Sequence, residues 1–339
     1  MSTITPLADT ANRPPPRVSV VIPAYNAAWS IARTLDSVLS QTYSDFEVIV
    51  VDDGSSDRTI DIVQNYIERD RRIRLISQPN LGVAAARNAA IAQARGVFIA
   101  PLDADDVWRA ENLTCQIAAL EAAGRSTPFS FAGTYLLDAL DVERKGPVFP
   151  KDLRADYVTL LRRNWVNCGS AAVFRRDAAL AAGGYSEKLR EEDAQGAEDW
   201  LLILHLASAA PGIIIRDPLV GYRISESSMS TKPVSMTRSV LRVIETMRKS
   251  GPALAPWHFW AARTNVLSWL LPRWYHAGDW RGVIRCVAGA YLANPLWFTE
   301  DIARRTLVTA LRAPFKSRRQ ARKGARTPVL KRRIDIDAP

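Results

Sequence analysis

The sequence predicts an α/β fold in which a mostly parallel sheet is flanked by helices. The first observation is repetition: a strand-like apolar run, a polar loop and a helical pattern follow one another along the first hundred residues. The second is that these apolar runs are continuous, as in strands buried on both faces inside a parallel sheet. Right-handed crossovers then bring the loops after the strands to one edge.

Each predicted element follows from its local pattern. β-branched runs predict strands, and apolar residues at helical spacing predict helices. The predicted strands are residues 17–23, 46–52, 74–77 and 97–102, and the predicted helices are about 31–39, 58–69 and the Ala-rich stretch to 95. Strand and helix alternate strictly, which is typical of parallel strands joined by helical crossovers.

Three carboxylates follow the strand over residues 97–102, namely Asp103, Asp105 and Asp106. Ligands bind at this edge of an open α/β sheet, and neighbouring carboxylates repel one another unless a cation or a proton compensates them. Mg²⁺ or Mn²⁺ held by one or two carboxylates keeps positions open for phosphate oxygens. The alternative is a solvated loop whose aspartates cap a helix over about 108–124.

A second acidic strand end is Asp52-Asp53. The Asp53 carboxylate only accepts hydrogen bonds, so it suits a ring N–H of a base or a ribose hydroxyl. The alternative is a turn aspartate in Asp-Gly, with Asp57 as a helix cap. Two acidic ends on one edge need partners, and Arg87 and Asn88, one helix away, are the candidates.

Several classes of protein are excluded by absent patterns. The chain carries neither Gly-x-Gly-x-x-Gly nor a P-loop, which argues against a dinucleotide dehydrogenase and a P-loop NTPase. Its three cysteines, an odd number and far apart, fit a reducing cytoplasm without a disulfide framework or zinc site. No run reaches the roughly 20 apolar residues of a membrane span. Residues 1–16 are polar and Pro-rich, which predicts a disordered leader and no signal peptide.

The net charge of +10 belongs to the end of the chain. Residues 312–333 carry ten Lys and Arg and no acid, so the remainder of the chain is neutral. Such a segment is attracted to anionic lipid, and the alternative is a solvated tail.

Past residue 126 the pattern changes. Residues 129–134 and 171–174 predict further strands, and residues 153–163 predict a surface helix between them. Glu198-Asp199 precede an apolar helix over 201–207. Acids at a helix start are often only partners of the helix dipole, and a carboxylate there is also a candidate general base.

From about residue 233 the chain is predicted to be helical. Residues 277–282 separate two apolar helical stretches, as in one hairpin of a tetratricopeptide-like kind. A single hairpin cannot bury its own face, so we expect it to dock on the catalytic domain or on a partner. Five tryptophans between residues 257 and 280 indicate an apolar docking face, which suits a membrane interface.

Four motifs in order resemble the family 2 glycosyltransferases of GT-A fold. They are Val-Val-Ile-Pro-Ala-Tyr-Asn26, Val-Val-Asp-Asp-Gly-Ser-Ser-Asp57, Asn80-Leu-Gly82 with Ala86-Arg87-Asn88, and Pro-Leu-Asp-Ala-Asp-Asp106. The resemblance covers about residues 17–230. It implies a Rossmann-like GT-A domain and an inverting transfer from a nucleotide-diphospho-sugar, most favourably a UDP-sugar.

The resemblance also assigns roles to residues. Those implied to bind the donor are Pro23, Tyr25, Asn26, Asp53, Arg87 and Asp103. Asp105 is implied to meet Mg²⁺ or Mn²⁺ in the Asp-x-Asp motif. Asp199 is implied to be the catalytic base with Glu198 as its neighbour, and Glu191-Glu192-Asp193 is the rival cluster.

On the acceptor side the resemblance points to Trp165, Gly183 and Gly184. Trp165 either stacks on a sugar ring or is a buried core aromatic. Many family members carry a histidine where this chain has Ser225, so activity is expected to rest on the aspartates, or Arg223 takes over the diphosphate contact.

The expected organisation is a leader (1–16), a GT-A domain (17–232), a helical appendage (233–311) and a basic tail (312–339). We expect a metal-dependent enzyme of the cytoplasm, peripheral at the inner face of the membrane. It would extend a glycan or lipid-linked acceptor in cell-surface polysaccharide synthesis, without binding nucleic acid. The alternatives are a sugar nucleotidyltransferase, which needs a Gly-rich basic loop after the first strand, and a non-catalytic nucleic-acid or lipid-binding protein.

Overall fold

A computed structural model describes most of the chain up to residue 294. The described ranges are 3–4, 14–138, 141–144, 146, 149–166, 168–224 and 232–294. The chain divides into two compact units, residues 1–266 and 267–339, and the boundary lies within helix α10 (Pro256–His276). The expected domain boundaries at 232 and 311 stay predictions, and the basic tail lies outside the described residues.

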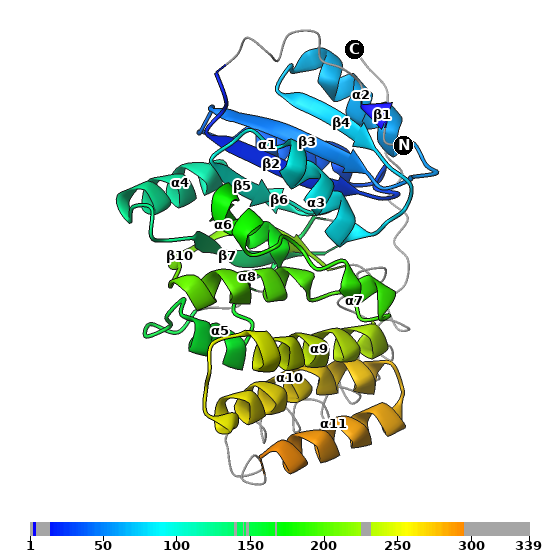
Figure 1. Ribbon diagram of the computed structural model, residues 1–339. Coiled ribbons are helices and arrows are strands. Elements are labelled where there is room, and N and C mark those ends of the chain that lie inside the picture. Colours follow the sequence, from blue (N-terminus) through cyan, green and yellow to red (C-terminus); the bar gives the residue numbers. More distant parts are fainter. Residues whose placement is uncertain are drawn as a thin grey trace, which may run out of the picture. The chain divides into compact units, whose positions relative to one another are not determined.

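One mixed sheet organises the first unit, with strand order β1-β4-β3-β2-β5-β9-β7-β10-β6 (Figure 1). Its first half is the predicted parallel sheet. The four parallel strands are β2 (Val18–Ala24), β3 (Phe46–Asp52), β4 (Ile73–Ser77) and β5 (Phe98–Pro101). All seven residues of β3 are buried, which is why its sequence is continuously apolar apart from its acidic residues.

The second half of the sheet contains both strand directions. Its members are β6 (Val107–Trp108), β7 (Phe129–Leu137), β8 (Glu143–Arg144), β9 (Ala172–Arg175) and β10 (Ile213–Arg223). β9 runs antiparallel to β5 and β7, whereas β10 runs parallel to β7 and pairs antiparallel with β6. Within the segment predicted to be a disordered leader, β1 (Thr3–Ile4) pairs with β4.

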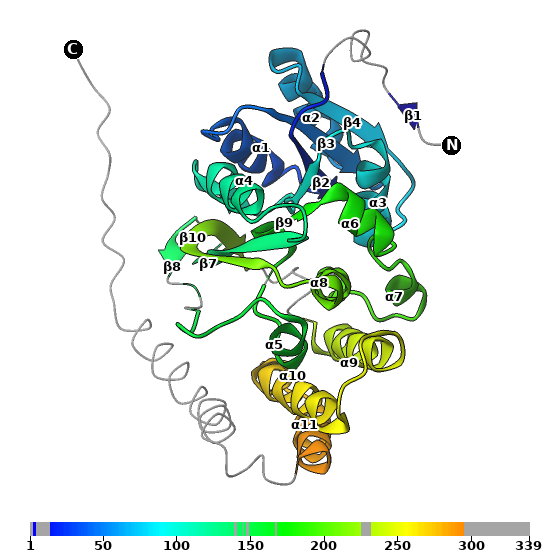
Figure 2. The ribbon, with the colours of Figure 1, turned by 60° about the vertical axis from the view of Figure 1, so that its left-hand side comes forward.

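Helices cover both faces of the sheet. Those of the first half are α1 (Ile31–Leu39), α2 (Thr59–Arg69), α3 (Val83–Gln93) and α4 (Asn112–Ala122). Those that follow are α5 (Tyr157–Arg162), α6 (Arg176–Ala181), α7 (Lys188–Glu191), α8 (Glu198–Ala209) and α9 (Pro233–Ser250). Figure 2 shows α1 and α4 on one face and α3 and α6 on the other. Farther along the chain, α5 and α9 both contact the apolar helix α8.

The predicted alternation of the first half is confirmed, and three differences have local causes. The helix expected from residue 108 begins at Asn112, because Val107 and Trp108 pair with β10. The helix expected on the surface is α5, and half of its six residues are buried. β10 itself was not predicted, since Pro218 interrupts its pattern and shifts its register against β7.

In the second unit the predicted helical hairpin is confirmed. α10 ends at a turn in which Gly278 has φ of 71°, and α11 (Trp280–Ala293) follows. The Asp279 side chain accepts a hydrogen bond from Gly282 N at 3.0 Å and so caps α11. A Cβ on Gly282 would lie 2.0 Å from the Trp274 ring, so glycine permits this close approach of the two helices. None of the helices in the described ranges is both long and apolar enough to cross a lipid bilayer.

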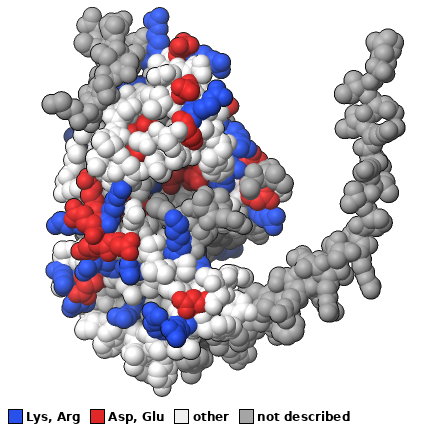
Figure 3. Space-filling view, turned by 90° about the vertical axis from the view of Figure 1, so that its right-hand side faces the viewer, with Lys and Arg blue, Asp and Glu red and all other residues white. Residues whose placement is uncertain are grey.

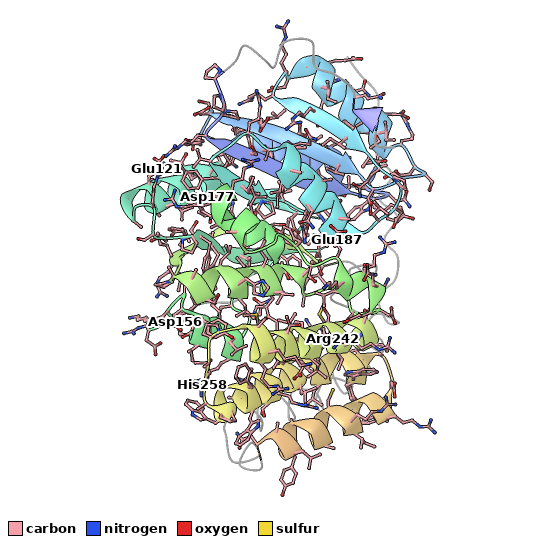
Figure 4. The ribbon with its side chains drawn as sticks, viewed as in Figure 1. Glu121, Asp156, Asp177, Glu187, Arg242 and His258 are labelled. Carbon is pink, nitrogen blue, oxygen red and sulfur yellow. The ribbon has the colours of Figure 1, made fainter. Side chains whose placement is uncertain are left out.

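The cap of α5 gives a first prediction. Asp156, labelled in Figure 4, accepts a hydrogen bond from Thr159 N at 2.8 Å. Asp156→Ala should lower the free energy of unfolding by about 1 kcal/mol, measured by urea denaturation, because one helix N–H loses its partner. Asp156→Asn keeps an acceptor oxygen and should stay close to the wild type. Equal losses in both variants would contradict a capping role.

Candidate active site

The loops that carry the predicted site residues do meet at one edge of the sheet. β2, β3 and β5 are parallel, and the last residues of β2 and β3, Ala24 and Asp52, are in register. Asp53 N donates to Ala24 O at 2.8 Å directly beyond this pair. The residues after each strand therefore project from the carboxyl edge, where open α/β sheets bind ligands.

The first two loops are tied to each other. Asn26, with φ of 49°, accepts a hydrogen bond from Ser56 N at 2.8 Å through Oδ1, and its own N donates to Ser55 Oγ at 2.9 Å. Pro23 lies within β2, and Tyr25, the first residue after this strand, is 55% exposed. The Tyr25 side chain, directly after the end of β2, is therefore exposed to solvent.

Asp53 holds the third loop. Its Oδ1 accepts hydrogen bonds from Gln78 Nε2 and Leu81 N, and its Oδ2 accepts one from Gly82 N, each at 2.8 Å. The residue is 4% exposed. In this structure Asp53 shapes the loop before α3, and its predicted contact with a base stays a prediction. Asp57 was expected as a helix cap; its Oδ1 accepts from Thr59 N at 3.0 Å, but the N-cap residue of α2 is Arg58, which forms no side-chain cap.

Arg87 lies at the centre of the site. Its side chain is 3% exposed; Nη2 donates to Asp103 Oδ1 at 2.5 Å, and Nη1 lies 3.4 Å from Glu198 Oε1. The guanidinium also sits 5.0 Å from the centre of the Tyr185 ring. Arg87 therefore supplies the expected partner of an acidic strand end, and it links Asp103 after β5 to Glu198 at the start of α8.

The Asp103–Asp106 loop is fixed by residues far along the chain. Ser170 Oγ donates to Asp106 Oδ2 at 2.6 Å and accepts from Asp103 N at 3.0 Å. Arg223 N donates to Asp106 Oδ1 at 2.9 Å, and Arg223 Nε donates to Asp105 O at 2.8 Å. Asp106 is 1% exposed. It thus anchors the loop, whereas Asp105 is only partly buried.

The Asp105 carboxylate suits a cation. Burial, and then the negative charge of Asp103, raise the pKa of Asp105 to about 6. A divalent ion would offset both effects, and oxygen donors of this kind are those Mg²⁺ and Mn²⁺ prefer. Among the residues that the structure describes, no group of three or more His, Cys, Asp or Glu is arranged to hold a metal.

Glu198 and Asp199 differ in their surroundings. Both oxygens of Glu198 are engaged, Oε1 by Arg87 and Oε2 by Gly196 N at 2.8 Å. In the described part of the chain, Asp199 takes a hydrogen bond only at Oδ1, from Trp200 N at 2.7 Å. Burial, and then the charge of Glu198, raise the pKa of Asp199 to about 7. Of the two, Asp199 has the properties of a proton acceptor at neutral pH.

The rival cluster lies on the surface. Glu191, Glu192 and Asp193 are exposed. Two of them pair with α9: Glu192 Oε2 lies 2.5 Å from Arg242, and Asp193 pairs with Arg238. Figure 3 shows acidic and basic side chains intermixed on the face that it presents, as such pairing requires. Exposed, paired carboxylates of this kind give no support to a catalytic role.

The acceptor-side residues have protein neighbours in this structure. Trp165 is partly buried, edge-on to Phe149 with ring centres 6.5 Å apart, and Arg163 lies 4.0 Å over its ring. Trp165 is therefore not a fully buried core aromatic, and Arg163 lies over its ring. Its proposed contact with a sugar stays a prediction.

Gly183 and Gly184 form a turn with φ of 82° and 70°. A Cβ on Gly184 would lie 2.7 Å from Asn88 Oδ1. Asn88 Nδ2 donates to Tyr185 O and to Oε1 of Glu187, which is labelled in Figure 4. The turn thus packs on α3. Asn88, expected as a partner for an acidic strand end, instead fixes this segment. The acceptor role of both glycines stays a prediction.

Sequence reasoning missed the part played by Ser170. It lies in a 3₁₀ turn, Gly169–Ala171, and a Cβ on Gly169 would lie 3.2 Å from Arg87 Nη2 and 3.6 Å from Asp199 Cβ. The only signal was the polar, glycine-containing run that ends at Ser170. Ser225, which stands where many family members carry a histidine, lies outside the described residues.

Comparison with known proteins identifies the family to which the chain belongs. Residues 19–180 match the family profile described as "Glycosyl transferase family 2". The chain is 34% identical over 240 residues to TuaG of Bacillus subtilis (strain 168). That protein is named as a putative teichuronic acid biosynthesis glycosyltransferase. That alignment covers 68% of this chain and 90% of the relative.

Solved structures agree on the fold. S. aureus TarS 1–349 in complex with UDP-GlcNAc superposes with a TM-score of 0.58 at 20% identity, over 90% of this chain and 92% of that one. The mannosyltransferase PcManGT from Pyrobaculum calidifontis, in complex with GDP-Man and Mn²⁺, gives 0.55 at 21% identity, over 88% and 87%. At these identities the likeness establishes the GT-A fold alone.

The buried pairs of Arg87 give a second prediction. Arg87→Met should lower the free energy of unfolding by about 3–5 kcal/mol, because Glu198 and Asp103 lose their counter-charge in a desolvated place. Arg58→Met is the matched control, since the Arg58–Asp61 pair is mostly exposed and should contribute less than about 1 kcal/mol. Similar losses in both variants, measured by urea denaturation, would refute the central role of Arg87.

Proposed function

Because the chain belongs to glycosyl transferase family 2, we propose that it moves a sugar from a nucleotide-diphospho-sugar to a hydroxyl of a glycan or lipid-linked acceptor, with inversion. The observation that carries the proposal is the setting of Asp199, which is partly buried and lies beside a Glu198 that pairs with Arg87. Its pKa is raised to about 7, and within the described residues its Oδ2 takes no hydrogen bond. A group of this kind can take the acceptor proton at neutral pH.

The donor would bind at the carboxyl edge of β2, β3 and β5. A UDP-sugar is the proposed donor, and the proposed contacts are those named above: Pro23, Tyr25, Asn26, Asp53, Arg87 and Asp103. The exposed Tyr25 ring offers a face on which a base can stack, because aromatic rings bind flat apolar surfaces while remaining partly hydrated. The complex of TarS with UDP-GlcNAc supports a nucleotide-sugar donor for this fold.

A divalent metal is proposed at Asp105, next to Asp103. Mg²⁺ or Mn²⁺ there would offset the charge that grows on the leaving diphosphate. The arginine Arg223, which already donates to the Asp105 carbonyl, lies at the same loop and is the proposed further contact for the diphosphate.

Asp199 and its neighbours would perform the proton transfer. The acceptor hydroxyl would give its proton to Asp199 while the hydroxyl oxygen attacks the anomeric carbon from the side opposite the diphosphate. The bond between that carbon and the diphosphate oxygen breaks in the same step, the nucleoside diphosphate leaves with the electron pair, and the centre is inverted. Glu198 would hold the start of α8 in place through Arg87 and would not itself accept the proton. Glycine at position 169, where a Cβ would lie 3.2 Å from Arg87 Nη2 and 3.6 Å from Asp199 Cβ, would leave room for the acceptor beside Asp199.

The two alternative functions lose their support. Membership of this family argues for transfer of a sugar and against nucleotidyl transfer or a purely binding role. The relationship to a protein named for teichuronic acid synthesis favours a task in cell-surface polysaccharide synthesis. We place that task in the cytoplasm, with the C-terminal region at the inner face of the membrane and no role in binding nucleic acid.

The donor and the metal are tested together by calorimetric titration with UDP, GDP, dTDP and CMP, each with and without Mn²⁺. We expect UDP to bind, and to bind more tightly with the metal. Asp105→Asn should remove the gain that Mn²⁺ gives while leaving the metal-free affinity unchanged. Equal affinity with and without Mn²⁺ in the wild type would refute the metal site, and binding by none of the four would refute the donor class.

The base is tested by Asp199→Asn. Transfer should fall by about 10²–10⁴-fold, because the amide cannot accept the proton, while UDP binding stays as in the wild type. In the wild type, kcat/KM should rise as pH passes about 7, because the ionised fraction of Asp199 rises there. Asp193→Asn is the control and should keep both activity and pH profile. Transfer by Asp199→Asn at the wild-type rate would identify the wrong base.

A further inference from the structure

Helix α11 is apolar on two sides. The side toward α10 buries Gly282, Cys286 and Ala290. The other side exposes large apolar residues: Trp280 at 58%, Ile284 at 65%, Tyr291 at 48% and Leu292 at 81%. Trp280, Ile284 and Leu292 follow a spacing of four or eight residues, which places them along one stripe of a helix.

This stripe carries positive charge only. Arg281 and Arg285 are exposed on α11, each one residue after a member of the stripe. The sequence from Trp280 to Asn294 contains no Asp or Glu. In the part of the chain that the structure describes, neither arginine forms an ion pair. An exposed apolar stripe edged by arginines is the pattern of a helix that lies in the interface of an anionic membrane.

The part of α10 in the second unit, from Leu267 onward, also combines an exposed apolar side chain with an arginine. Trp269 is 44% exposed, and the Arg273 guanidinium lies 3.6 Å over its ring. Tryptophan and arginine prefer the boundary between head groups and acyl chains, where an apolar body and a polar tip are both satisfied. Charge adds to this, because the ten Lys and Arg of residues 312–333 follow in the same chain.

We infer that the stripe of Trp280, Ile284 and Leu292, with Arg281 and Arg285, is a docking surface for an anionic lipid bilayer. This inference rests on the peripheral location proposed above and names the residues that would achieve it. A second copy of the chain is the less favourable occupant, since two such stripes would bring four arginines together without a single acid from α11. A bilayer that contains anionic lipid meets both the apolar and the charged part of the surface.

The test is sedimentation of the full chain with vesicles of phosphatidylcholine, with and without phosphatidylglycerol. We expect binding only to the anionic vesicles, weakening as salt rises. Ile284→Ser with Leu292→Ser, and separately Arg281→Gln with Arg285→Gln, should each weaken binding by roughly tenfold or more. These residues are outside the core of the hairpin, so the variants should keep the wild-type circular dichroism.

Leu180→Ser with Val97→Ser is the matched control, since both residues are exposed apolar residues of the first unit, at 49% and 43%. It should bind vesicles as the wild type does. Removal of residues 312–339 separates the basic tail from the stripe, and the truncated chain should retain part of the binding. UDP titration of every variant keeps this test apart from that of the proposed function, because a lost docking surface leaves donor affinity unchanged.

Three results would overturn the inference. The first is vesicle binding unchanged in both pairs of α11 variants. The second is a change of oligomeric state in those variants by light scattering, with vesicle binding intact, which would make a second copy the occupant. The third is loss of all binding on removal of the tail alone, because the stripe would then contribute no binding of its own.

Discussion

The site depends on one buried guanidinium. Arg87 belongs to α3, which packs on the parallel half of the sheet, and it neutralises Asp103, after β5, and Glu198, at the start of α8, at the same time. Carboxylates from two distant segments meet in a place with little water only because a positive charge lies between them. Asp199 follows Glu198 at the start of α8, and Asp105 lies two residues after Asp103 in the same loop. Arg87 thus adds a charged link between the parallel half of the sheet and α8, beside the hydrogen bonds of Ser170 and Asn88.

The parallel half of the sheet was predictable from the sequence for a physical reason. Strands buried on both faces must be apolar throughout, so β3 was predicted with its observed bounds, and the order of strand and helix fixed the edge at which Asp53 and Asp103 lie. The antiparallel half was not predictable in this way. β10 is only partly buried at its start and contains Pro218, so its pattern resembles neither a strand nor a helix.

The hydrogen-bond partners of the site residues could not be predicted from the sequence either. A motif indicates that Asp53 is an acceptor, but whether it accepts from a ligand or from Leu81 and Gly82 depends on how a loop folds back. Ser170 gave no signal because one small hydroxyl has no pattern of its own, although it holds the Asp103–Asp106 loop from 64 positions away. Roles of this kind are set by tertiary contacts, and a single sequence does not record them.

The hydrogen bonds from Arg223 to the Asp103–Asp106 loop have a consequence for the order of folding. Asp106 receives one of its hydrogen bonds from a residue 117 positions later, and β6 next to it pairs with a strand near residue 220. Contacts of such sequence separation form late, because closing a long loop costs conformational entropy before any contact repays it. While the chain is being synthesised, the parallel half of the sheet can therefore form before the acidic loop gains its contacts with Arg223. A nascent chain shorter than about 220 residues already contains Ser170 and Arg87, but it lacks the Arg223 N–H groups that donate to Asp106 and to the Asp105 carbonyl.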